Sequence, residues 1–426
     1  MSGPDRRRFL SSVLGTAAAA GVMPRTAAAS GQYAARPPLP TPPGPVADEA
    51  YWELVRDQFP VREGLVMMNA ANLCPSPYPV IDAVATITRD IDADASFQNR
   101  AKLGVLRGEA RAALAAHVGA DASEIAITRN TSEGNNTVVN GLTLQPGDEV
   151  VLWDQNHPTN NVAWDVKAER TGCVVRRVET PAAPRNADEL IAPFREALTP
   201  RTKVVSFSHV SNASGIRMPA GELCALARDR GAFSLVDGAQ SFGVLKIDLH
   251  AMGCDFYTGS SHKWFIGPKE AGLLYVRQGR IDDLWASNVG VGWSRALENG
   301  AQKFDNLGQR DDAAVTAMGT AARFHQTIGI EQIEARSMAL VAGLRDRIRQ
   351  GVPGVRFSPD VEPTLSAGVL VVIPPRGDPR ALFDALYTKH HVAGAPRAAG
   401  VRLSPHLYNT LAQTERVAEA FAAEMS

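Results

Sequence analysis

Residues 255–264 read Asp-Phe-Tyr-Thr-Gly-Ser-Ser-His-Lys-Trp, a short apolar strand that runs directly into a polar turn carrying Lys263. Upstream, the apolar run 233–236 leads into Asp237-Gly238-Ala239-Gln240. In an open α/β sheet, ligands bind where parallel strands end, so polar residues directly after strands are the informative ones. The two segments therefore predict that an amine and a carboxylate emerge from neighbouring strand ends.

The surrounding sequence alternates apolar, β-branched runs with amphipathic helical stretches. This alternation predicts βαβ units, and hence an α/β fold with a seven-stranded, mainly parallel sheet and helices on both faces. We expect a large domain over 46–305 and a smaller C-terminal α+β domain over 306–426. The predicted strands are 124–128, 149–153, 174–179, 203–208, 233–236, 256–258 and 272–276, and the predicted helices include 132–142, 161–171, 187–198 and 220–230.

Composition excludes several classes of protein. The 426 residues carry 44 basic and 45 acidic side chains, so a net charge of -1 favours neither nucleic acid nor an anionic membrane surface as partner. Four cysteines are too few for a disulfide scaffold, and we expect free thiols. No apolar run is long enough for an ordinary membrane span. His390 and His391 do not predict a metal site, because neighbouring residues on a strand face opposite sides.

The N-terminus has the pattern of an export signal. Arg6-Arg7-Arg8-Phe9-Leu10 precedes a mildly apolar stretch and the small-residue site Ala27-Ala28-Ala29, as in twin-arginine signals. We expect residues 1–29 to be a signal peptide that the twin-arginine translocase recognises, so that a bacterial cell delivers the folded enzyme to the periplasm or outside. A basic, alanine-rich tail that stays attached is the alternative. Residues 30–45 are expected to be a proline-rich linker.

A lysine and an aspartate at adjacent strand ends fit the chemistry of pyridoxal 5'-phosphate. Its aldehyde requires a lysine, and its pyridine nitrogen requires a carboxylate that keeps the proton in place. Its phosphate requires backbone N–H groups at a helix N-terminus. Asn130-Thr131-Ser132-Glu133-Gly134, between a predicted strand and a predicted helix, offers such a terminus with capping side chains.

Four motifs in order resemble one known family. They are Ser-His-Val-Ser-Asn-Ala-Ser-Gly (208–215), Val-Asp-Gly-Ala-Gln (236–240), the stretch 255–264, and Arg-Leu-Ser-Pro-His-Leu-Tyr-Asn-Thr (402–410). Together they are similar to the class V aminotransferase family of fold-type I pyridoxal-phosphate enzymes, and within it to the isopenicillin N epimerase-like branch. The N-terminal leader also resembles that of the exported, pyoverdine-tailoring enzyme of this branch.

The resemblance implies roles for individual residues. Lys263 would form the Schiff base and, once freed by substrate, move the proton at Cα. Asp237 would pair with the pyridinium nitrogen, and His157 would stack on the ring, although a loop histidine without function is the alternative. The other implied cofactor contacts surround the phosphate and the ring hydroxyl, and they are Thr131, Ser132, Glu133, Ser260, His262, Asn212 and Gln240.

On the substrate side, the resemblance implies that Arg402 holds a carboxylate, with Arg397 as the rival clamp and Asn72 nearby. Arg402 as a structural ion-pair partner is the alternative. Relatives build each site across a homodimer interface, where many carry a threonine that reaches the partner's phosphate. This chain has Gln309 at that position.

The sequence excludes some reactions of the family but leaves several reaction types open. Cysteine desulfurases of the family need a nucleophilic cysteine on a C-terminal loop, and residues 385–405 contain none, so desulfuration is disfavoured. Transamination, epimerisation, decarboxylation and β-elimination at the α-amino acid group of a small molecule or peptide remain open. Export favours maturation of a secreted peptide or a pyoverdine-like siderophore.

Two other classes of function compete with this interpretation. Ala239-Gln240-Ser241-Phe242-Gly243 resembles a hydrolase nucleophile elbow, for which Asp311 and His406 could complete a triad. A periplasmic binding protein without chemistry would explain export and the α/β content, but not Lys263 and Asp237 at adjacent strand ends.

Overall fold

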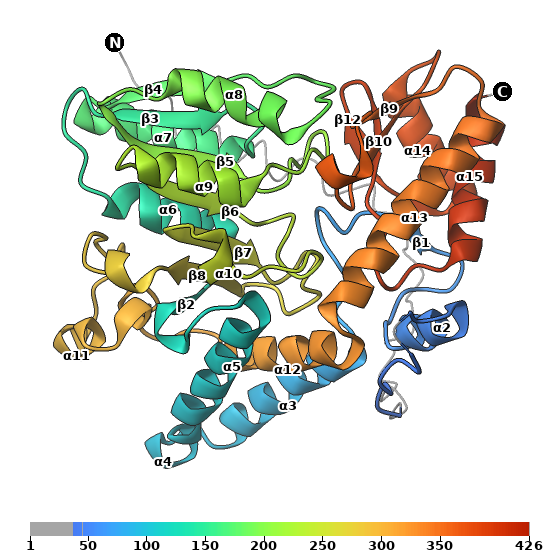
Figure 1. The fold of residues 1–426 in the computed structure, drawn as a ribbon. Coiled ribbons are helices and arrows are strands. Elements are labelled where there is room, and N and C mark those ends of the chain that lie inside the picture. Colours follow the sequence, from blue (N-terminus) through green and yellow to red (C-terminus); the bar gives the residue numbers. More distant parts are fainter. Residues whose placement is uncertain (1–36, 45, 426) are drawn as a thin grey trace, which may run out of the picture. The chain divides into compact units, whose positions relative to one another are not determined.

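In the computed structural model, seven strands form one sheet that confirms the predicted α/β class (Figure 1). The sheet runs in the order β2-β8-β7-β6-β5-β3-β4, with β8 antiparallel to both neighbours and the pairs from β7 to β4 parallel. The strands are β2 (Ile125–Thr128), β3 (Glu149–Trp153), β4 (Val174–Val178), β5 (Thr202–Ser208), β6 (Phe233–Asp237), β7 (Phe256–Ser260) and β8 (Gly272–Val276).

The structure describes residues 37–44 and 46–425. Residues 39–426 form one compact unit, and the other unit, residues 1–38, is described only at its last two prolines. The expected signal peptide and part of the expected linker therefore lie outside the described residues. Within the described part of the chain, no helix is both long and apolar enough to span a membrane.

Strand composition explains why both faces of this sheet are covered. Every residue of β2, β3, β7 and β8 is buried, as expected when helices pack on both faces of a mainly parallel sheet. The four predicted helices are present, and α7 begins earlier than expected because His157 caps it and Pro158 occupies its first turn. These helices are α6 (Thr131–Gly141), α7 (Pro158–Thr171), α8 (Ala187–Ala197) and α9 (Ala220–Asp229).

A second group of helices packs below the β2 side of the sheet in Figure 1, where α12 (Asp312–Ile328) contacts both α3 (Tyr78–Ala93) and α5 (Lys102–Val118). Alanine and glycine on α12 allow this close approach, since most of its side chains are small and buried. The other short helices outside the small domain are α2 (Glu49–Asp57), α4 (Phe97–Arg100), α10 (Leu249–Met252) and α11 (Trp293–Leu297), with 3-10 turns η1 (Ala122–Glu124), η2 (Gln278–Arg280) and η3 (Gly300–Phe304).

The smaller C-terminal domain contains an antiparallel sheet of order β12-β13-β10-β9. Its own core joins this sheet to α13, α14 and α15. The N-terminal strand β1 (Val66–Met67) pairs with β11 (Val392–Ala393), so residues near 66 reach this domain. The exact boundary at 305/306 stays a prediction. The elements are β9 (Arg356–Ser358), β10 (Leu370–Ile373), β12 (Ala395–Arg397), β13 (Gly400–Leu403), α13 (Ile330–Gly351), α14 (Pro379–His390), α15 (Leu411–Met425) and η4 (Pro363–Leu365).

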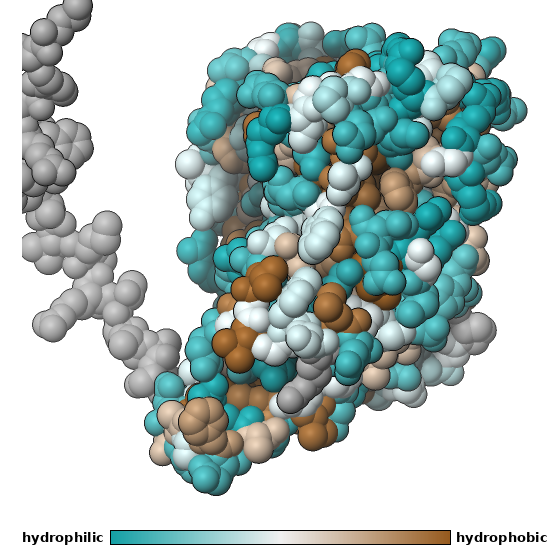
Figure 2. Space-filling view, turned by 90° about the vertical axis from the view of Figure 1, so that its left-hand side faces the viewer, coloured by the Kyte–Doolittle hydropathy of each residue, from teal (hydrophilic) through white to brown (hydrophobic). Residues whose placement is uncertain are grey.

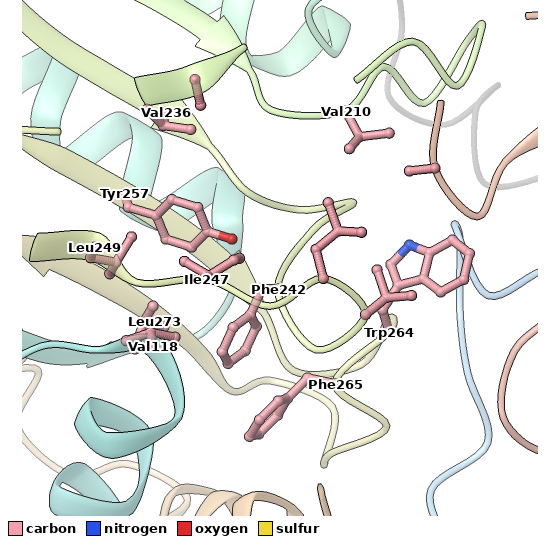
Figure 3. Packing of buried hydrophobic residues seen from close by; sticks show 14 of the residues in the cluster. Val118, Val210, Val236, Phe242, Ile247, Leu249, Tyr257, Trp264, Phe265 and Leu273 are labelled. Atoms are coloured by element: carbon pink, nitrogen blue, oxygen red, sulfur yellow. The ribbon is translucent and has the colours of Figure 1, made fainter. Parts of the chain in front are cut away.

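Aromatic packing fixes the segment that follows β7. Phe242 and Phe265 stack with ring centroids 4.3 Å apart, next to the buried Tyr257 and Trp264 (Figure 3). Gly243 has a φ of +92°, and a Cβ there would lie 2.4 Å from the Phe265 backbone. Only glycine combines this backbone conformation with this close approach. The turn that carries Lys263 is therefore held against the core.

Candidate active site

Asp237 ends β6 and is almost completely buried. Its Oδ2 accepts a hydrogen bond of 2.9 Å from Asn135 Nδ2, and its Oδ1 accepts one of 3.0 Å from the Ala239 N–H. Thr258 on β7 donates in turn to Asn135 Oδ1 at 2.7 Å. This chain fixes the orientation of the carboxylate. The contact with Ala239 is local, whereas the contact with Asn135 ties the carboxylate to the helix that begins at Thr131.

Lys263 lies three residues beyond the end of β7, within the electrostatic reach of Asp237 and Arg402. Burial lowers the pKa of its amine; the negative charge of Asp237 opposes this shift, and the positive charge of Arg402 adds to it. The structure contains no hydrogen bond from the Lys263 amine to any described residue. An amine with a lowered pKa and no fixed partner is suited to act as a nucleophile.

Two buried histidines anchor the residues that follow Lys263. His406 Nε2 donates to the Trp264 carbonyl oxygen at 2.7 Å, and His325 Nε2 donates to that of Phe265 at 3.1 Å. Because carbonyl oxygens only accept, both rings carry their proton on Nε2. The sequence indicated neither role. His406 lies in the motif 402–410, but its partner is distant in sequence and could not be identified from spacing.

The side chain of Gln240 forms hydrogen bonds with two other residues of the chain. Its Nε2 donates to the Ala71 carbonyl at 2.9 Å, and its Oε1 accepts from Trp264 Nε1 at 2.7 Å. Trp264 follows Lys263 directly, so Gln240 connects the Asp237 turn to the lysine turn. One amide hydrogen remains for the predicted contact with the ring hydroxyl.

The structure contradicts the hydrolase alternative. Ser241 is completely buried, and its hydroxyl lies 2.9 Å from the Tyr257 hydroxyl and 3.3 Å from the Gly238 carbonyl oxygen. Asp311 caps α12 by accepting from the Ala314 N–H, and His406 holds Trp264. Each of the three expected triad residues therefore has another partner, and the hydrolase prediction is wrong. The sequence pattern suggested a nucleophile because it does not show that the Ser241 side chain points into the core.

The N-terminus of α6 faces the end of β7. Thr131 and Ser260 are joined by two contacts, from the Thr131 N–H at 2.9 Å and between the two hydroxyls at 2.8 Å. Asn130 caps the helix by accepting from the Glu133 N–H, and Ser132 is exposed. Of the predicted phosphate contacts, the Ser132 N–H and hydroxyl are therefore without a partner among the described residues, whereas the Glu133 N–H is already bound.

Two histidines flank this arrangement. His157 precedes α7, and its Nδ1 accepts from the Thr159 N–H at 3.3 Å. Burial lowers the pKa of His157 most, and the positive charge of Lys263 lowers it further. The negative charge of Asp237 opposes the shift, whereas Arg397 and Arg402 add to it. Residues from β6, from the turn after β7 and from β12 and β13 therefore all lie within electrostatic reach of His157. Burial, followed by Lys263 and Lys269, lowers the pKa of His262 to about 4, so both rings are neutral at pH 7.

Arg397 and Arg402, the two residues predicted to bind a carboxylate, donate hydrogen bonds to the same backbone oxygen. Arg402 Nη1 and Arg397 Nη2 donate to the Asn212 carbonyl at 3.1 and 3.0 Å, and Arg402 Nη2 donates to Asn69 Oδ1 at 3.0 Å. Arg402 is 3% exposed and forms no ion pair with any described residue. It is thus not the structural ion-pair partner considered as the alternative.

The predictions for Asn72 and Gln309, two exposed residues, have different outcomes. Asn72 is exposed, and the only hydrogen bond described for it runs from its backbone N–H to the Asn69 carbonyl. Asn69, which sequence reasoning missed, is the residue of this segment that contacts Arg402. Gln309 is exposed, and its Oε1 accepts from Arg100 at 2.8 Å, so its contact with a partner subunit stays a prediction.

These residues fit pyridoxal phosphate. The oriented carboxylate of Asp237 suits a pyridine nitrogen, the unpartnered amine of Lys263 suits an aldehyde, and the N-terminus of α6 suits a phosphate. Comparison with known proteins agrees. The sequence profile of the aminotransferase class-V family matches residues 70–417. The chain belongs to this family.

As a class-V enzyme, the protein uses pyridoxal 5'-phosphate and acts on an amino acid; the alternative of a binding protein without chemistry is therefore wrong. It is 31% identical over 389 residues to isopenicillin N epimerase of Amycolatopsis lactamdurans, which covers 87% of this chain and 97% of the relative. A probable cysteine desulfurase of Methanothermobacter thermautotrophicus is 29% identical over 401 residues, 86% of this chain and 96% of the relative.

The fold of this class-V chain matches that of solved relatives. The apo structure of cysteine desulfurase from Thermococcus onnurineus NA1 superimposes with a TM-score of 0.79 and 24% identity, over 88% of this chain and 98% of that chain. At this level of identity the match establishes the architecture alone.

Proposed function

We propose that the protein breaks a bond at the Cα of a substrate that bears a free α-amino acid group, with Lys263 moving the proton. The observation that supports this most is that Lys263 is buried, which lowers its pKa, and that it lies within electrostatic reach of both Asp237 and Arg402. Pyridoxal phosphate, when bound, supplies an electron sink that stabilises negative charge on Cα. Lys263 then needs only to exchange a proton at that atom.

The surrounding residues support this role. Asp237, oriented by Asn135, keeps a proton on the atom that it faces. Arg402 binds the substrate carboxylate and so determines which Cα bond is aligned for cleavage. His406 and Gln240 hold Trp264 and thereby restrict the position of Lys263.

Desulfuration is not the proposed reaction. All four cysteines are free and buried. Cys74 contacts the lysine turn by donating its N–H to the His262 carbonyl, and burial raises the pKa of its thiol to about 12. A protonated, buried thiol is a poor nucleophile. Proton movement at Cα, as in an epimerase, therefore fits the site better than sulfur transfer.

The test uses purified holoenzyme and Lys263→Ala. We expect the wild type to absorb near 410–430 nm, to lose that band on borohydride treatment, and to exchange the Cα proton of its substrate for deuterium in D₂O. Lys263→Ala should lose both properties. A colourless wild type that stays colourless with added pyridoxal phosphate would contradict the proposal. A coloured enzyme without deuterium exchange would move the reaction to decarboxylation.

We also propose that the enzyme is a homodimer with its sites at the interface. Asn288 lines a pocket together with Ser132 and Glu133, and it also lines a second pocket that includes Gln309. The segment around Asn288 exposes Trp285, Val289 and Val291, and Figure 2 shows apolar residues on the face where this segment and α11 lie. Such a cluster is typical of a protein interface.

A second copy that covers these apolar residues would also close the phosphate end of the site. Light scattering should give the mass of a dimer for the wild type. Val289→Asp with Val291→Asp should give a monomer that retains cofactor poorly. A monomeric wild type with full cofactor occupancy would rule the proposal out.

Finally, we propose export by the twin-arginine route and a role in maturing a secreted peptide or a pyoverdine-like siderophore. The support is the sequence of residues 1–29 alone. Replacing Arg6, Arg7 and Arg8 by lysine should retain the protein in the cytoplasmic fraction. If deletion of the gene left the exported metabolites unchanged by mass spectrometry, the maturation role would fail.

A further inference from the structure

Arg397 and Arg402 lie on neighbouring strands of one hairpin. In the pairing of β12 with β13, Ala395 lies opposite Arg402 and Arg397 lies opposite Gly400. Residues two apart on a strand share a face, and so do residues directly opposite, so the two arginines are diagonal neighbours on the same face. Their shared acceptor, the Asn212 carbonyl, confirms that both guanidinium groups point to one place.

Every hydrogen-bond partner of these two guanidinium groups in the described chain is neutral. The acceptors are the carbonyls of Asn212 and Pro396 and the side-chain oxygen of Asn69. Two positive charges held side by side repel each other, and burial makes the unpaired inner charge more costly. The site therefore has a surplus of positive charge that a bound anion can neutralise.

The two arginines occupy different depths. Arg402 is 3% exposed, and its charge acts on Lys263. Arg397 is half-buried on the edge strand, and its Nη1 donates to the Pro396 carbonyl in an exposed bond. The inner arginine is placed for the carboxylate next to Cα, and the outer arginine for a group farther along the substrate.

We propose that the substrate carries a second carboxylate, beyond its α-carboxylate, and that Arg397 binds it. One α-carboxylate neutralises only one of the two cations, whereas a dicarboxylate neutralises both. The substrate class is thus an α-amino acid with an acidic side chain, either free or with the acid supplied by an attached peptide. This inference rests on the proposed function and refines its substrate.

The experiment titrates the holoenzyme with L-glutamate and L-glutamine, which differ in the distal charge, and with γ-L-glutamylglycine, whose distal acid belongs to a peptide. Binding is followed by the change in visible absorption and, independently, by the rise in the thermal unfolding temperature. We expect the acidic ligands to bind more tightly than glutamine. The tighter of the two acidic ligands identifies the source of the second carboxylate.

Arg397→Gln should raise the Kd of the preferred acidic ligand by about tenfold or more and change that of glutamine by less than about twofold. Arg397→Lys should recover part of the loss, because it keeps the charge. Arg356→Gln is the matched control, an exposed arginine on the opposite edge strand β9 of the same sheet. It should leave every Kd unchanged.

Equal binding of glutamate, glutamine and the peptide by the wild type would overturn the inference, as would an equal loss for charged and neutral ligands in Arg397→Gln. Both outcomes leave the proposed function intact, because the visible band still responds to amino acids. A wild type without the borohydride-sensitive band would instead overturn the proposed function and this inference together.

Discussion

Two buried arginines of this enzyme have opposite surroundings. Arg336 on α13 binds Glu49 through two hydrogen bonds of 2.6 and 3.0 Å, donates to the Asn409 carbonyl, and lies over the Trp52 ring. Arg402 on β13 has only neutral partners. Both are less than a tenth exposed, so burial alone does not distinguish them.

The difference lies in where the counter-charge comes from. Arg336 joins α2 to α13 and the start of α15, and the chain supplies its carboxylate. Arg402 lies within electrostatic reach of Lys263, and we propose that the substrate supplies its carboxylate. A buried cation without an acidic partner weakens the fold, and such a residue is therefore informative about function.

The largest effect is expected from Arg402→Met, which keeps the apolar stem and removes the charge. Binding of an amino acid to the holoenzyme should weaken by about 2–4 kcal/mol, while the free energy of unfolding stays the same or rises. Visible titration and denaturant unfolding measure the two quantities. An unchanged Kd in a folded variant would indicate that Arg397, and not Arg402, binds the α-carboxylate.

The next largest effect is expected from the buried, neutral His406, which makes the free energy of unfolding depend on pH. Burial lowers the pKa of His406 to about 4, and its hydrogen bond to Trp264 opposes the shift only in part. The unfolded chain binds this proton near pH 6.5, whereas the folded chain does not until near pH 4. The free energy of unfolding should therefore fall as pH drops through this window, by about 3 kcal/mol at most for this residue.

His406→Gln should flatten that fall, as measured by denaturant unfolding at pH 7 and pH 4.5. His250→Gln is the control, because a hydrogen bond to Glu124 raises the pKa of His250, and its stabilisation is lost as pH rises rather than falls. The same pH dependence in His406→Gln as in the wild type would assign the effect to other groups.

Arg336→Met is expected to lower the free energy of unfolding by about 2 kcal/mol, because Glu49 and the Asn409 carbonyl lose their donor. Its Kd for amino acids should not change. Arg349→Met, an exposed position on the same helix, is the control. Weaker substrate binding with unchanged stability would reverse the roles assigned to the two arginines.

The smallest effect is expected at Arg380, which pairs with Asp384 at 3.0 Å on the exposed face of α14. Arg380→Ala should change the free energy of unfolding by no more than about 0.5 kcal/mol, because water screens exposed pairs. A loss comparable to that of Arg336→Met would show that exposure does not decide the strength of these pairs.

The sequence by itself determined the α/β class, the seven strands and the positions of Asp237 and Lys263 after two of them. These features depend on local periodicity and on the rule that parallel strands end at one edge, both of which can be read along the chain. The bounds of α7 were less well predicted, since a cap and a proline extended the helix beyond its apolar pattern.

Only the tertiary structure decided which loops meet. Arg402 binds Asn69 and Asn212, His406 holds the residue after Lys263, and Ser241 turns into the core. No local pattern encodes these contacts, because packing of distant segments determines which polar groups are buried together. The unpaired charge of Arg402 was likewise invisible in a sequence with nearly equal numbers of acids and bases. Only the folded arrangement leaves Arg402 without an ion pair among the described residues.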